Sequence, residues 1–153
     1  SAIAALLDGH AAVEKVYFPG LESHPGHAVA ARQQAGFGAM LSFELAGGAD
    51  GDQERAVRAF VDALRWFTLA ESLGGVESLV AHPATMTHAA MSAEARAKAG
   101  ISDGLLRLSI GIEATEDLVA DIAAALRAAE AAVAAQGVPA QQAAPARQQW
   151  VDA

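Results

Sequence analysis

The stretch that decides the fold is "LLRLSIGI", residues 105–112, because bulky apolar residues occupy every second position. One face of the alternation carries Leu106, Leu108, Ile110 and Ile112, and the other carries Leu105, Arg107, Ser109 and Gly111. A period of two predicts a strand with one buried face. Arg107 therefore lies on the face that points away from the core.

Two further strands are predicted upstream of this one. In "GAMLSFELAGG", residues 38–48, Leu41, Phe43 and Leu45 alternate with more polar neighbours, and the paired glycines mark a turn. A shorter strand is expected between Val13 and Phe18, because β-branched and aromatic residues there are stopped by a Pro-Gly turn.

Four helices are predicted between and around these strands. They cover "SAIAALLDGH" at residues 1–10, a segment from Ser23 or Pro25 to Gly36, "DQERAVRAFVDALRW" at 52–66, and a long helix from Thr115 to Gly137. Leu118, Ile122 and Leu126 form the apolar stripe of the last helix, with Thr115 as its expected N-cap. Interleaved helices and strands predict an α/β or α+β sandwich, a mixed sheet with helices on one face.

Composition bounds the class of protein. The 153 residues are 53% hydrophobic, and a net charge of -8 without any basic stripe argues against a nucleic-acid partner. No apolar run approaches the roughly 20 residues of a membrane span, and neither cysteine nor a signal peptide points to secretion, so we expect a cytoplasmic protein. Residues 1–136 are expected to form one domain, and the Pro-, Gln- and Ala-rich residues 137–153 a flexible tail.

Arg107 is the most informative single charge. A guanidinium among apolar strand residues needs an anion, because its desolvation is otherwise costly. Two alternatives follow: an internal salt bridge, to Glu77 or Glu113, or the carboxylate of a substrate.

Other chemistry is poorly supported by the motifs. The histidine pairs His24/His27 and His82/His88 lack the three or four converging ligands of a metal site, so no metal is predicted. Ser72 and Ser78 lie in no GxSxG motif, which argues against a nucleophilic serine.

Four segments, taken in order, resemble one family. They are "YFPGLESHPGH" (17–27), "ARQQAGFGAMLSFEL" (31–45), "FTLAESLGGVESLVAHPATMTHAAM" (67–91) and "GISDGLLRLSIGIEATEDLVADI" (100–122). They resemble the carboxy-terminal domain of the pyridoxal-phosphate-dependent enzymes of Cys/Met metabolism, and most of all its cystathionine γ-synthase branch. The resemblance implies a small domain of the aspartate-aminotransferase-like fold (fold type I) that follows a large cofactor domain in a homotetramer. The chain is thus expected to be a fragment whose beginning is missing.

The resemblance also implies which residues bind the amino-acid substrate. Arg107 matches the family's clamp for the α-carboxylate, Ser72 a position that lines the same site, and Glu71 a pocket position facing the distal part of the substrate. The family's cofactor-binding lysine and phosphate cup belong to the preceding domain, and neither Lys15 nor Lys98 lies in the expected motif. We therefore expect no catalytic, cofactor-binding or metal-binding residue here, pyridoxal phosphate bound mainly by the N-terminal domain of the same enzyme, and no activity of the fragment alone.

The implied reaction is γ-replacement on an O-acylhomoserine by cysteine, a trans-sulfuration step of methionine biosynthesis. The alternatives are a cystathionine γ-lyase or a methionine γ-lyase, and the acid at Glu71 resembles the synthase and the γ-lyase more than the methionine γ-lyase. An alternative of another class is a non-catalytic oligomerisation or ligand-binding module that keeps only the fold.

Overall fold

A computed structural model describes residues 1–47, 51–86 and 88–135 of the chain. Its helices are α1 (Ala2–Asp8), α2 (His27–Gln33), α3 (Asp52–Ala63), α4 (Ala93–Lys98) and α5 (Thr115–Ala134). Its strands are β1 (Val13–Tyr17), β2 (Met40–Leu45), β3 (Thr68–Leu69), β4 (Leu79–Ala81) and β5 (Leu105–Ser109). The predicted tail, residues 137–153, lies outside the described residues, so the domain boundary stays a prediction.

The five strands form one mixed sheet in the order β1-β2-β5-β4-β3. All neighbours are antiparallel except β3 and β4, which run parallel. Leu41 pairs with Leu108 and Phe43 with Leu106, so the apolar residues of β2 and β5 lie on the same face. The predicted strands therefore align in the register that buries both alternating patterns together.

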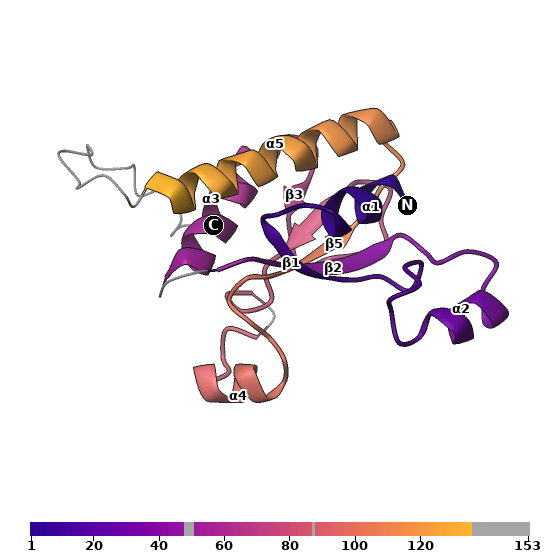
Figure 1. Cartoon of the computed structure of the whole chain (residues 1–153), viewed down its shortest axis with the longest axis horizontal. Helices are drawn as coiled ribbons and strands as arrows, with labels where there is room; N and C mark the ends of the chain where they lie inside the picture. Colours follow the sequence, from indigo (N-terminus) through magenta and orange to yellow (C-terminus); the bar gives the residue numbers. More distant parts are fainter. Residues whose placement is uncertain (48–50, 87, 136–153) are drawn as a thin grey trace.

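Three helices, α1, α3 and α5, cover that apolar face (Figure 1). The stripe predicted on α5 is buried, and the Phe43 ring meets the Phe60 ring of α3 edge-on at 5.5 Å between centroids. The fully buried large side chains of this core are Phe43, Phe60, Leu7, Leu45, Leu106, Leu108, Leu118, Ile122, Leu126 and Val80. The core thus consists of one sheet face and one layer of helices.

The other side of the sheet is only partly covered. Helix α4 lies on that side, and α2 lies beyond one end of the sheet (Figure 1). The prediction of helices on one face is correct for the three helices that pack on the core, but α4 departs from it. Its sequence "AEARAK" has no bulky apolar stripe, so this short helix has nothing to bury in the core.

Several details of the sequence prediction are wrong at element ends. The N-cap of the last helix is Ala114 rather than Thr115, and the helix predicted over residues 52–66 ends at Ala63. Strand β5 stops at Ser109, and Ile112 is 82% exposed because its N–H bonds to the carbonyl of Val76 (2.9 Å) instead of continuing the ladder. Helix α2 begins at His27 rather than at Ser23 or Pro25, since successive turns occupy the preceding residues and the Nδ1 of His24 accepts from the Gly26 N–H.

Candidate functional site

Arg107 lies at the middle of β5 and is flanked by Ser42 of β2 and Ala81 of β4. As predicted, it lies on the sheet face opposite the helix-covered core and is half-buried. Its guanidinium Nη2 donates to the backbone carbonyls of Glu71 (3.0 Å) and Ser72 (3.1 Å). The structure therefore brings together the three residues that the sequence singled out, although they are 35 and 36 positions apart.

The partners of Arg107 are neutral, which contradicts the salt-bridge alternative. Among residues 1–47, 51–86 and 88–135, Arg107 forms no ion pair, and Glu113 bonds to Ser78 instead. Two carbonyl acceptors on one nitrogen orient the guanidinium without neutralising its charge. The planar fork keeps its complementarity to an incoming carboxylate, which it can bind with two parallel hydrogen bonds.

Glu71 and Ser72 belong to residues 70–78, the connection between β3 and β4, which we call the site loop. Residues 71–77 are exposed, and Glu71 and Ser72 contact Arg107 through their carbonyl oxygens. Gly74 has a φ of +75°, a left-handed conformation that glycine adopts without a steric penalty. The loop therefore turns sharply just after the two carbonyls that meet Arg107.

Buried hydroxyls and one carboxylate attach the site loop to the end of β5 and to the segment that follows it. Ser109 Oγ accepts from the Gly74 N–H (2.8 Å), and Glu113 accepts from the Ser78 N–H (2.7 Å) and hydroxyl (2.8 Å). Ser78 Oγ in turn accepts from the Gly111 N–H (2.9 Å). Burial raises the pKa of Glu113, but hydrogen bonds from its own backbone N–H and from Ser78 outweigh this and hold the pKa below its usual value.

The sequence reasoning missed these contacts to different degrees. Ser109 shares the face of Arg107 in the strict alternation, so a signal for its position was present. For Glu113 the only signal was its charge, and that signal pointed to Arg107 rather than to Ser78. The absence of a side chain at Gly111 has a steric reason, because a Cβ there would lie 2.4 Å from the carbonyl oxygen of Val76 in the site loop.

The described residues do not form a pyridoxal-phosphate site of their own. That cofactor needs a lysine for covalent attachment, and the chain has only Lys15 and Lys98. Both are exposed: Lys15 lies on β1 with its Nζ 4.8 Å from the centre of the Tyr17 ring, and Lys98 ends α4. No step through the cofactor is therefore assigned to residues of this chain.

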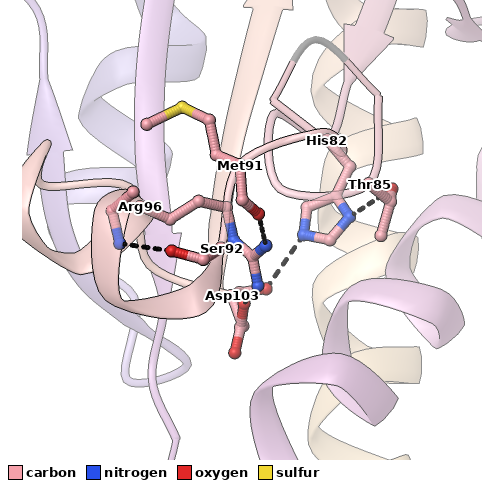
Figure 2. A network of polar contacts seen from close by, with 7 residues as sticks. His82, Thr85, Met91, Ser92, Arg96 and Asp103 are labelled. Carbon is pink, nitrogen blue, oxygen red and sulfur yellow. Dashed lines mark hydrogen bonds and ion pairs between the residues drawn. The ribbon is translucent and has the colours of Figure 1, made fainter.

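A polar network fixes the segment between β4 and β5 (Figure 2). His82 is buried, with Nδ1 2.8 Å from the Thr85 hydroxyl and Nε2 2.9 Å from the Asp103 carbonyl. Arg96 donates to the Met91 carbonyl (3.0 Å) and pairs with the Asp103 carboxylate (3.4 Å). Both nitrogens of His82 are thus used structurally, and in the described part of the chain no group of His, Asp or Glu is arranged to hold a metal ion.

Beside this segment a cavity of about 500 Å³ opens between the outer sheet face and α4. The Tyr17 hydroxyl donates to one carboxylate oxygen of Glu44, and the Ser102 hydroxyl donates to the other at 2.8 Å. The hydrogen bond to Glu44, together with burial, raises the pKa of Tyr17 to about 12. Several polar groups of this lining bond to one another, whereas the buried Nε of Arg96 has no hydrogen-bond partner among the described residues. None of the described helices has the length and hydropathy to cross a membrane.

Comparisons with known proteins agree with this architecture. The model of the family "Cys/Met metabolism PLP-dependent enzyme" matches residues 1–127. Cystathionine γ-synthase of Escherichia coli is 59% identical over 84% of this chain and 32% of the relative, and cystathionine β-lyase of Lactococcus lactis subsp. cremoris is 56% identical over 81% and 31%. A cystathionine β-lyase was not among the reactions predicted from the sequence.

A solved structure gives the same picture. Cystathionine γ-synthase from Xanthomonas oryzae pv. oryzae, in complex with aminoacrylate and cysteine, superposes with a TM-score of 0.78 at 76% identity. The match covers 86% of this chain and 33% of that one. The chain thus spans about a third of the length of the relatives it matches. With 127 of its 153 residues matched by the family model, the chain belongs to the family of pyridoxal-phosphate-dependent enzymes of cysteine and methionine metabolism.

Proposed function

We propose that this chain is the carboxy-terminal, substrate-binding domain of a cystathionine γ-synthase of fold type I, with pyridoxal phosphate held mainly by a preceding domain. The observation that carries the proposal is the contact of the Arg107 guanidinium with the carbonyls of Glu71 and Ser72. It leaves a cation without an acidic partner in the described part of the chain, on the sheet face opposite the core. The 76% identity to a cystathionine γ-synthase of known structure supports the choice of reaction.

In this proposal Arg107 binds the α-carboxylate of the amino-acid substrate with two parallel hydrogen bonds. A bidentate clamp fixes both the position and the plane of the carboxylate, so the rest of the substrate extends in one direction. Glu71 lies next to the clamp, and its exposed carboxylate faces a more distant part of the substrate. The chain's contribution is therefore binding and orientation, and the fragment alone is inactive.

The reaction assigned to the complete enzyme is a γ-replacement. The sulfur of cysteine forms a bond to Cγ of an O-acylhomoserine, the bond between Cγ and the ester oxygen breaks, and the acyl group leaves as a carboxylate. The thiol proton is released with it, so no oxidant or reductant is needed. We place this enzyme in the cytoplasm as a homotetramer, and light scattering of the purified enzyme tests that assembly.

Substitution of Arg107 in the complete enzyme tests the proposal. Arg107→Ala should raise the KM for the O-acylhomoserine roughly 10- to 100-fold, since a hydrogen bond to a charged group contributes about 1.5–3 kcal/mol. Arg107→Lys should recover only part of this loss, because lysine keeps the charge but lacks the planar fork. Arg127→Ala, which removes an exposed arginine from α5, is the matched control. An unchanged KM for Arg107→Ala would overturn the proposal.

The second candidate is a lyase of the same family, favoured by the 56% identity to cystathionine β-lyase of Lactococcus lactis subsp. cremoris. Parallel assays of the complete enzyme separate the two: condensation of O-acylhomoserine with cysteine against cleavage of cystathionine. The synthase predicts that condensation has the higher kcat/KM, and a higher value for cleavage would favour a lyase. A protein without bound pyridoxal phosphate or either activity would support the non-catalytic module.

A further inference from the structure

We propose that Glu113 is a positioning residue for the substrate carboxylate, acting on Arg107 through the site loop. The inference rests on the proposed function, because it concerns the same carboxylate clamp. In the described part of the chain, no hydrogen bond or ion pair joins Glu113 to Arg107. Glu113 bonds to Ser78, at the far end of the loop that carries the two carbonyls that bind Arg107.

Polar contacts, rather than burial, order the site loop. Its bulky residues Leu73 and Val76 are 54% and 67% exposed, and all of residues 71–77 are exposed. A loop with so little buried apolar surface has little to offset the entropy of fixing its backbone. Its conformation therefore depends on the few hydrogen bonds that attach it to the rest of the fold.

Apart from the Arg107 contacts, the side-chain hydrogen bonds of the loop converge on four residues, which we call the clasp: Ser78, Ser109, Gly111 and Glu113. Backbone hydrogen bonds add to them, from Ile112 to the Val76 carbonyl (2.9 Å) and from Thr68 to the Ser78 carbonyl (3.0 Å). The two oxygens of Glu113 accept from the N–H and the hydroxyl of buried Ser78, and that hydroxyl oxygen accepts from Gly111. Ser109 accepts from Gly74 at the turn of the loop. The side-chain contacts at one end of the loop therefore depend on a single carboxylate, and a hydroxyl two residues from Arg107 holds the middle of the loop.

The site loop connects the clasp to Arg107, because it carries the two carbonyls that bind the guanidinium. The Glu71 and Ser72 carbonyls are the hydrogen-bond partners of the Arg107 guanidinium in the described part of the chain. If the loop moves, Arg107 loses both acceptors and its fork no longer has one orientation. The result should be weaker binding of every substrate carboxylate, and a rise in KM larger than any change in kcat.

The test is a double-mutant cycle in the complete enzyme. Glu113→Ala should raise the KM for the O-acylhomoserine roughly tenfold, because the buried Ser78 N–H loses its acceptor. Glu113→Gln should have a smaller effect, since its amide oxygen still accepts from that N–H. In the Arg107→Ala background Glu113→Ala should change KM less than about twofold, because two residues that act through one contact are not additive. Glu116→Gln, an exposed carboxylate in the first turn of α5, is the matched control.

Hydrogen exchange gives a second readout. Glu113→Gln and Ser109→Ala should each speed amide exchange in residues 70–78, while the amides of α5 keep their wild-type rates. Ser109→Ala should raise KM in the same direction as Glu113→Gln. These two variants carry the test if Glu113→Ala does not fold.

The outcomes separate the two proposals. If Arg107→Ala raises KM but the Glu113 and Ser109 variants do not, the clasp has no positioning role and this inference alone is overturned. It is also overturned if Glu113→Ala raises KM by the same factor with and without Arg107, which would indicate a general structural effect. An unchanged KM for Arg107→Ala would overturn the proposed function and this inference together.

Discussion

The two faces of the central sheet are stabilised in different ways, and strand β5 contributes to both. Leu106 and Leu108 are fully buried beneath the helices, while Arg107 and Ser109 face the site loop. The first pair is held by non-directional burial shared with many neighbours, and the second by a few directed hydrogen bonds. The first face therefore provides most of the buried apolar surface of the fold, and the second carries the residues to which we assign substrate binding.

The largest expected effect sharpens this contrast. Leu108→Ala should lower the free energy of unfolding of the chain by about 2–5 kcal/mol, because it leaves a cavity in the core. Leu105→Ala, on the opposite face of the same strand and half-buried, should cost clearly less. Urea denaturation of both variants measures the difference, and equal losses would show that both faces contribute alike to stability.

The second largest effect on stability is expected for a polar contact of Asp121, on α5. Both carboxylate oxygens of buried Asp121 accept from the backbone N–H of Arg65 (2.9 and 3.1 Å), and one also accepts from Trp66 (2.9 Å). Asp121→Ala should cost about 1–3 kcal/mol, since it leaves partly buried donors unpaired. Asp117→Ala, exposed on the same helix, is the control in the same denaturation experiment. A similar loss in both variants would contradict a special role for Asp121.

A smaller effect is expected for Glu113, as a pH dependence of the free energy of unfolding. Because Glu113 has a pKa below its usual value when folded, its contribution to stability is present above the unfolded-state pKa and is lost as the pH falls. The loss should begin near pH 4.5, the ordinary value, and be complete below the folded pKa. Wild type and Glu113→Gln should therefore converge in stability on acidification, as measured by urea midpoints against pH. A constant difference would contradict the assignment.

The smallest effect on stability at neutral pH concerns Tyr17, the single tyrosine of the chain. Ultraviolet absorbance of tyrosinate should show a midpoint near 12 in the folded chain, and Glu44→Gln should lower it toward 10. The raised pKa means that its contribution to stability is present below pH 10 and is lost as the pH rises through 12. A wild-type midpoint near 10 would argue against the Tyr17–Glu44 hydrogen bond.

Much of the fold could be predicted from local patterns. The alternation of Leu41, Phe43 and Leu45 on β2, and the stripe of Leu118, Ile122 and Leu126 on α5, are buried as expected. Such patterns are readable because the periods of strand and helix fix which neighbours share a face. The ends of elements were harder: the sequence predicted that Ile112 continues the buried face, but a contact with Val76 draws the backbone away.

Some features of the candidate site could likewise be predicted from the sequence, and others could not. The sheet face that carries Arg107 followed from its place in an alternating strand. Glu71 and Ser72, which the family resemblance named together with Arg107, do contact it. The partner of Glu113 could not be read from sequence, because Ser78 is 35 residues away and only the path of the site loop brings the two together. One prediction for Arg107 was an internal salt bridge to an acidic residue. In the described structure its hydrogen-bond partners are neutral backbone carbonyls instead.

The sequence by itself determined most of the buried apolar residues, where most helices and strands lie, and which side of the sheet carries Arg107, because these properties depend on neighbours within a few positions. Only the tertiary structure decided which groups bond to Arg107 and Glu113. Those choices depend on how a loop folds back over a sheet, and carboxylates at Glu71, Glu77 and Glu113 are chemically equivalent until the chain gives each its own surroundings.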